Sequence, residues 1–133
     1  MRTIKFRGKW GDLWAHGNLY IRKHEEFGDC AYIIGYTEKP STTIVDINTI
    51  GQFTGLRDKK GREIYEGDIV RFPTPVNEGK YRIGYIGFHQ LSASFRIITK
   101  SSDLGLGNRC GVHEMTIEVI GNIHDNPELL QHN

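Results

Sequence analysis

The segment from residue 54 to residue 72, TGLRDKKGREIYEGDIVRF, compresses two short apolar strand patterns and two tight turns into one stretch of chain. Asp58 suits the first turn because its side chain can accept a hydrogen bond from the backbone two residues on. Gly61 can adopt the positive φ that closes such a turn, and Gly67 offers the same freedom at the second turn. A crossover between parallel strands needs about a dozen residues or more. The short spacing therefore predicts antiparallel strands.

Alternation of apolar and polar residues predicts strands along most of the chain. We expect residues 38–48 to form mainly a polar connection and residues 101–111 a loop. Asn126 stands before Pro127, a pair that favours a helix start, so we predict a short C-terminal helix of about one to two turns. The predicted strands cover residues 3–7, 13–21, 31–36, 43–45, 62–65, 69–72, 81–88, 95–99 and 115–123.

Length and composition fit one compact unit. A chain of 133 residues is long enough to bury a core, and its 16 glycines, 6 tyrosines and 6 phenylalanines suit many short strands and turns. We expect a single domain, with a subdivision into an N-terminal β part over residues 1–48 and a C-terminal β part over residues 49–133. The predicted fold is mainly β, with a small antiparallel β-barrel-like C-terminal part, N-terminal β-hairpins and the short C-terminal helix.

Charge and cysteine usage exclude few functions. The 17 basic and 16 acidic side chains give a net charge of +1, so no global electrostatic attraction to nucleic acid or to a membrane follows. Cys30 and Cys110 stand far apart, in no zinc or redox spacing, and we expect two free thiols. The start, MRTIKFRGKW, carries charges where a signal peptide would be apolar, which favours a cytoplasmic protein.

Motifs for catalysis are missing from the sequence. There is no nucleophile elbow, P-loop or dinucleotide fingerprint, so we predict no catalytic residue, no cofactor and no metal, and an enzyme is unsupported. A catalytic triad could still assemble from residues that are distant in the sequence, so an enzyme is not excluded. We consider His113 with Glu114 and His124 with Asp125 as pairs of a histidine and an acid, and we place them in solvated turns or at strand ends. The histidines are His16, His24, His89, His113, His124 and His132.

The acidic residues of the 54–72 segment have two interpretations. Asp58, Glu63, Glu66 and Asp68 could bind a divalent cation. Turn chemistry explains them better, because Asp58 would cap its turn while Glu66 and Asp68 would solvate a corner. On that interpretation, the neighbouring cations neutralise these acids.

The basic residues of the same segment form the candidate binding surface. Cations near aromatic rings are typical of small barrels that bind single-stranded nucleic acid, although an aromatic residue in a barrel strand usually belongs to the core. This candidate surface consists of Arg57, Lys59, Lys60, Arg62, Tyr65 and Arg71, with Phe72 nearby.

A second group of cations and aromatic residues lies at the N-terminus. It comprises Arg2, Lys5, Arg7, Lys9, Trp10 and Trp14. Alternation predicts that Lys5 and Arg7 face solvent while Ile4 and Phe6 point inward, so a solvated strand face explains this group as well as a binding face does.

Three stretches of the sequence resemble the YopX family, small proteins encoded mainly by phages and prophages of bacteria. They are the start TIKFRGK, the segment IGQFTGLRDKKGREIYEGDIVRF from Ile50, and the end EVIGNIHDNPELL from Glu118. The resemblance spans nearly the whole chain and implies a mostly β fold with a barrel-like C-terminal part. It supplies no established activity, substrate, cofactor or catalytic residue.

The sequence leaves functions of different classes open. The first is a non-enzymatic phage accessory protein of the bacterial cytoplasm that binds protein partners and forms a homo-oligomer, because short strands leave edges and surface aromatics that self-association covers. The alternative is a small β-barrel that binds nucleic acid. A weaker third is a metal-dependent hydrolase.

Overall fold

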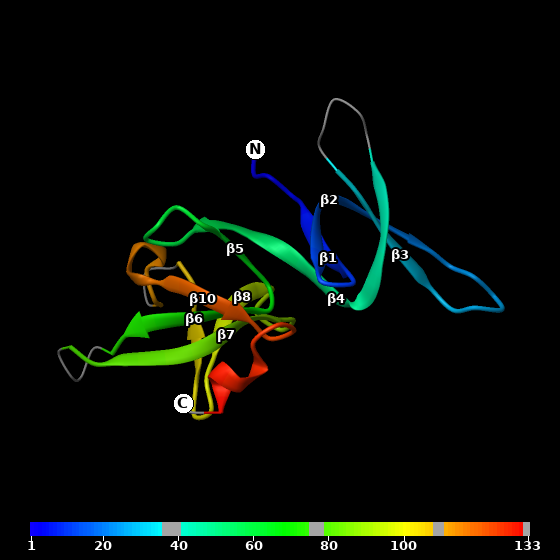
Figure 1. The fold of residues 1–133 in the computed structure, drawn as a ribbon. Coiled ribbons are helices and arrows are strands. Elements are labelled where there is room, and N and C mark those ends of the chain that lie inside the picture. Colours follow the sequence, from blue (N-terminus) through cyan, green and yellow to red (C-terminus); the bar gives the residue numbers. More distant parts are fainter. Residues whose placement is uncertain (36–40, 75–78, 108–110, 132–133) are drawn as a thin grey trace. The chain divides into compact units, whose positions relative to one another are not determined.

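The computed structural model describes residues 1–35, 41–74, 79–107 and 111–131 (Figure 1). The chain divides into two compact units, Met1–Phe53 and Thr54–Asn133. Every ladder between named strands is antiparallel among the described residues. The prediction of a mainly β, antiparallel fold is therefore confirmed.

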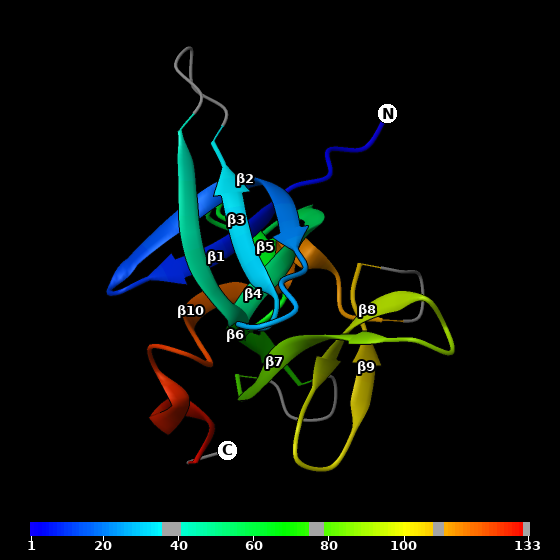
Figure 2. The ribbon, with the colours of Figure 1, turned by 90° about the vertical axis from the view of Figure 1, so that its right-hand side faces the viewer.

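The N-terminal unit is a small sheet whose strands pair in a ring. The order is β1-β2-β3-β4, and β4 also pairs with β1; β2, β3 and β4 run side by side in Figure 2. Ala31, Ile33 and Val45 are buried inside it. The sequence predicted hairpins here but not the closing pair. The strands are β1 Phe6–Trp10, β2 Leu13–Arg22, β3 Cys30–Ile34 and β4 Thr42–Arg57.

Gly17 lets β2 change partners. It pairs with Phe6 of β1, and the next residue, Asn18, pairs with Ile34 of β3. A Cβ atom on Gly17 would clash with the backbone carbonyl of Ile34. This close approach requires glycine, because any side chain would push β3 away from β2.

Two predictions for the N-terminal unit are wrong. Within the expected connection, residues 42–48 belong to β4, whereas residues 36–40 lie outside the described part of the chain. Arg7 was expected to face solvent but is only 8% exposed, and Ile4 is half exposed instead of buried. Arg7 can be buried because its guanidinium lies over the Trp14 ring, 4.6 Å from the centroid.

The C-terminal unit is a barrel-like, partly closed sheet. Its order is β10-β6-β7-β8-β9, with β5 paired to β4. The core contains Ile64, Val70, Phe72, Ile86 and Ile97, all at most 1% exposed. The strands are β5 Glu63–Tyr65, β6 Asp68–Pro73, β7 Tyr81–His89, β8 Ser94–Ile98, β9 Asp103–Gly105 and β10 Glu118–Asn122.

The last third of the chain departs from the prediction in three places. The expected loop contains the short strand β9, and the expected strand over residues 115–123 begins as a 3₁₀ turn, η1 (Glu114–Thr116), before β10. The expected C-terminal helix is only a 3₁₀ turn, η2 (Pro127–Leu130). Asn126 does not cap it through its side chain, because Asn126 Oδ1 accepts a hydrogen bond from the backbone N–H of Asn122, 3.2 Å away.

The turn between β4 and β5 is built around the carboxylate of Asp58, which is 1% exposed. Asp58 Oδ1 accepts hydrogen bonds from the backbone N–H groups of Lys60 and Arg62, both at 2.9 Å. Its Oδ2 accepts a third from the N–H of Val119 in β10, also at 2.9 Å. Gly61 has the predicted positive φ, 79°. The expectation that Asp58 caps its turn is therefore confirmed.

Asp68 is not the solvated residue that was expected. It is 2% exposed, and its Oδ2 accepts a hydrogen bond from the backbone N–H of Tyr65 at 2.7 Å. The carboxylate thus caps the second turn from inside, where Gly67 has a φ of 88°.

The substitution Asp58→Ala should lower the free energy of unfolding by about 3 kcal/mol or more, because three partly buried backbone N–H groups lose a charged acceptor. Chemical denaturation followed by circular dichroism measures this. The matched control is Asp103→Ala, which removes an exposed acid 2.6 Å from Arg96 Nε and should cost less than about 1 kcal/mol. Equal losses in the two variants would contradict a structural role for Asp58.

Candidate functional site

Cations from different parts of the C-terminal unit surround the carboxylate of Glu118 on β10. Lys60 Nζ lies 2.8 Å from Glu118 Oε1, and Arg71 Nη2 lies 2.7 Å from Oε2. Lys59 Nζ is farther away, at 3.6 Å from Oε2. Arg71 and Glu118 face each other across the ladder between β6 and β10. The lysines come from the Asp58 turn, so the fold brings together residues that are almost sixty positions apart.

Arg57 and Arg62 flank this group. Arg57 Nη1 donates to the backbone carbonyl of Gly61 at 3.0 Å, and its Nη2 lies 3.7 Å from Glu63 Oε2. Arg62 Nη1 donates to the carbonyl of Val119 at 3.1 Å. These arginines are exposed, yet each is fixed at one end to the backbone or to an acid.

The prediction that Tyr65 supplies the aromatic ring of this surface is wrong. Tyr65 is only 3% exposed, so its ring belongs to the interior and cannot stack on a surface ligand. The structure places another tyrosine beside the cations instead. Tyr81 on β7 is 55% exposed, and the Arg71 guanidinium lies over its ring, 5.2 Å from the centroid. We call Arg57, Lys59, Lys60, Arg62, Arg71 and Tyr81 the cationic face.

The cations act strongly on Glu118. Hydrogen bonds from Lys60 and then from Arg71 lower the pKa of this carboxyl from its ordinary 4.5 to about 2. Its side chain is only 13% exposed, whereas those of Lys60 and Arg71 are 54% and 44% exposed. The anion is therefore enclosed while the cations still reach solvent.

Glu118 and Tyr81 were missed as members of the surface. The sequence suggested that cations and acids of the 54–72 segment neutralise one another. This holds for Arg57 and Glu63, 3.7 Å apart, whereas Asp58 and Asp68 bind backbone N–H groups. The partner of Lys60 and Arg71 lies on β10. Only the register between β6 and β10 could have revealed this partner. The residues next to Glu118 in the sequence do not indicate that it meets Lys60 and Arg71.

A different surface lies on the N-terminal sheet. Tyr20, Tyr32 and Ile44 stand directly opposite one another on β2, β3 and β4, so they share one face. Tyr20 and Ile44 are 54% and 50% exposed, and the rings of Tyr20 and Tyr32 are 6.2 Å apart. We call these three residues the Tyr20 row.

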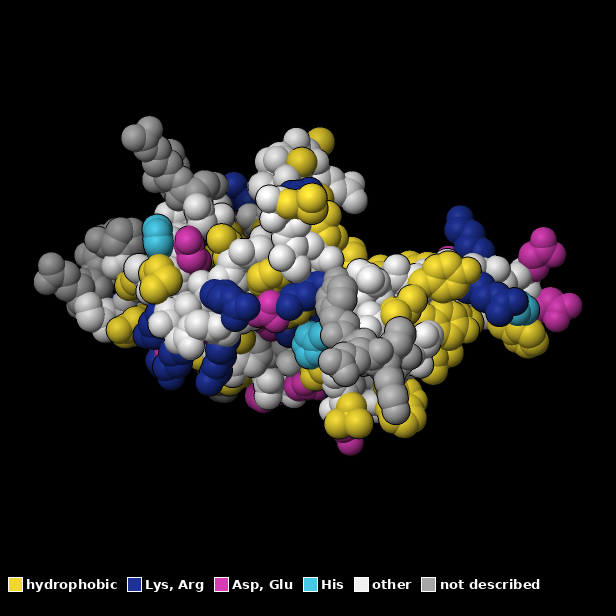
Figure 3. All heavy atoms as spheres, turned by 90° about the horizontal axis from the view of Figure 1, so that it is seen from above, with side chains coloured by type: hydrophobic (Ala, Val, Ile, Leu, Met, Phe, Trp, Pro, Cys, Tyr) yellow, Lys and Arg dark blue, Asp and Glu magenta, His cyan; other side chains and the backbone are white. Residues whose placement is uncertain are grey.

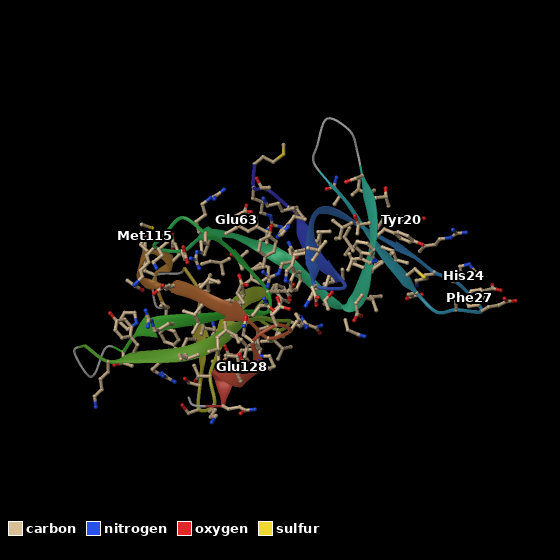
Figure 4. All side chains as sticks on the ribbon, viewed as in Figure 1. Tyr20, His24, Phe27, Glu63, Met115 and Glu128 are labelled. Atoms are coloured by element: carbon tan, nitrogen blue, oxygen red, sulfur yellow. The ribbon has the colours of Figure 1, made fainter. Side chains whose placement is uncertain are left out.

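The turn after β2 extends this hairpin with charged residues and one aromatic ring. Tyr20, His24 and Phe27 follow the hairpin toward its turn in Figure 4, and the rings of His24 and Phe27 are 5.1 Å apart. Hydrophobic side chains gather along the hairpin in Figure 3, and charged ones lie at its end. Lys23, Glu25 and Glu26 belong to that end.

In the N-terminal group of cations and tryptophans, two cations cover the Trp14 ring, and Trp10 and Trp14 both line a concavity. Arg7 and Lys9 lie over the ring of Trp14, with Lys9 Nζ 5.7 Å from its centroid. Trp10 and Leu13 are exposed and line a concavity of about 570 Å³ together with Ile33 and other residues of the same unit. The group is therefore not one continuous cationic surface.

The described histidine, cysteine and acidic side chains were also compared with the arrangements that metal sites need. They contain no group of three or more His, Cys, Asp and Glu side chains placed to hold a metal ion. His113 caps η1, because its Nδ1 accepts a hydrogen bond from the N–H of Met115 at 3.1 Å. Cys30 is a free thiol, whereas Cys110 and His132 lie outside the described part. None of the described helices is long and apolar enough to span a membrane.

The fold defines a mainly β protein built from two antiparallel sheets. The chain belongs to the YopX family, because the family model described as YopX protein matches residues 5–131. It is also similar to protein EF1440 from Enterococcus faecalis, known from a crystal structure, with a TM-score of 0.57 and 26% sequence identity. That similarity covers 98% of this chain and 99% of the other. No curated protein matches the sequence.

Lys60→Ala and Arg71→Ala should each raise the pKa of Glu118 from about 2 toward 4.5, because each removes a hydrogen bond to the ionised carboxyl. Carboxyl chemical shifts followed by NMR during a pH titration measure this. Lys59→Ala, whose amine lies 3.6 Å away, is the control and should change the value less. An unchanged pKa in all variants would contradict the described contacts.

The same shift fixes the direction of the pH dependence. A lowered pKa in the folded protein means that Glu118 stabilises the fold fully above about pH 4.5, and this contribution is lost as the pH falls through about 2. Glu118→Gln should therefore flatten the change of unfolding free energy over that pH range.

Proposed function

We propose that the protein is a non-enzymatic phage or prophage accessory protein of the bacterial cytoplasm that acts by binding protein, with a second copy of its own chain as the partner. The observation that carries this proposal is the Tyr20 row, an aromatic and aliphatic strip across neighbouring strands with about half of Tyr20 and of Ile44 exposed. Family membership supports the setting.

The chemistry of the row suits a protein interface. Tyrosine is enriched at the centres of such interfaces because its ring buries a large area and loses little conformational entropy. The row has polar neighbours at both ends of the strands, Arg22 on β2 and Thr42 on β4. An apolar centre with a polar rim is the usual arrangement of an interface that forms in water.

A second copy fits this face better than an unrelated partner does. A sheet face that carries the same row on both molecules can pack on itself about a two-fold axis, so each Tyr20 would meet apolar groups of the other chain. Burial of these rings would remove the exposed hydrophobic area that the isolated unit leaves in water.

The double variant Tyr20→Ser with Ile44→Thr should abolish self-association. Light scattering coupled to gel filtration, over a range of protein concentrations, should show an oligomer for the original chain and the 15.2 kDa monomer for the variant. Tyr81→Ser is the matched control, because it removes an equally exposed tyrosine from the C-terminal unit and should leave the oligomer intact. A monomeric original chain at every concentration would refute the proposal.

A further inference from the structure

We propose that the cationic face is a second binding surface, which takes the sugar-phosphate backbone of a single-stranded nucleic acid and stacks one base on Tyr81. This inference concerns the C-terminal unit and does not depend on self-association through the Tyr20 row.

The first support is the excess of positive charge that remains exposed. Lys59, Lys60 and Arg71 share the one carboxylate of Glu118, which can neutralise only a single positive charge. Arg62 donates to a neutral backbone carbonyl. Such a local surplus attracts polyanions even though the net charge of the whole chain is only +1.

The second support is that Lys60 and Arg71 already bind an oxyanion, the carboxylate of Glu118. The two oxygens of Glu118 accept from Lys60 and Arg71 at 2.8 Å and 2.7 Å, the separations expected when such groups bind a phosphate. Glu118 thus acts as an internal counter-ion that holds the side chains in a phosphate-binding arrangement. A bound phosphate would contact the exposed sides of the same cations.

The third support distinguishes a single strand from a duplex. Tyr81 is 55% exposed beside Arg71, so an unpaired base can stack on the part of the ring that Arg71 leaves free. Bases within a duplex are stacked on one another and cannot reach such a ring. Cations next to an exposed ring therefore favour single strands, whereas cations alone would bind any polyanion.

Fluorescence anisotropy with labelled oligodeoxyuridine and oligouridine of about 16 nucleotides tests the proposal. The full-length protein should bind at about 50 mM salt and lose affinity steeply toward about 200 mM. The two oligomers share the phosphate chemistry, so a difference in affinity between them identifies DNA or RNA as the preferred source. A duplex of the same length should compete poorly.

Variants locate the binding. Tyr81→Ala should weaken binding roughly 5-fold to 150-fold, and Lys60→Ala and Arg71→Ala should each reduce the slope of log affinity against log salt by about 1. The control Arg96→Ala removes a cation of β8 outside the cationic face and should change little.

Three results would overturn the proposal: no binding at low salt, equal losses in Arg96→Ala and Lys60→Ala, or a duplex that binds as tightly as the single strand. Lys60 lies in an exposed turn, so Lys60→Ala keeps the test valid if Arg71→Ala fails to fold. The double variant Tyr20→Ser with Ile44→Thr should retain binding, which separates this result from the outcome for self-association.

Discussion

The C-terminal unit depends on one buried carboxylate. Asp58 binds two N–H groups of its own turn and the N–H of Val119, so it joins the turn after β4 to β10. The backbone continues the connection, because the N–H of Lys59 donates to the carbonyl of Ile117 at 3.0 Å. This junction brings Lys59 and Lys60 beside Glu118. A residue that serves folding therefore also determines the position of the cationic face.

Local features of this architecture could be predicted from the sequence. Asp58 and Gly61 have the side chain and the backbone freedom that a tight turn needs, and both act within a few residues of chain. Gly67 is an equally local case. Asp68 shows the limit of such reasoning, because an acid next to a glycine fits both a solvated corner and a buried cap. The N–H of Tyr65 makes it a cap, and that depends on how deeply the turn is buried.

Features that depend on strand register could not be predicted. Alternation says which side chains share a face but not which face is covered, and both Ile69 and Val70 are fully buried although they point to opposite sides of β6. The same ambiguity hid the difference between Tyr65, which lies in the core, and Tyr81, which is exposed. Glu118 meets Arg71 only because β10 pairs with β6, across 47 residues of chain.

Stability explains the cations around Glu118 only in part. Hydrogen bonds from Lys60 and Arg71 stabilise the ionised carboxyl, but ion pairs whose cations are exposed usually contribute less than about 1 kcal/mol to folding. The turn is already held by Asp58, and β10 is already held by its ladder with β6. Lys59, Lys60 and Arg71 also repel one another, and one carboxylate cannot offset all three charges. This partly unneutralised charge is the feature on which the proposed binding of an external polyanion depends.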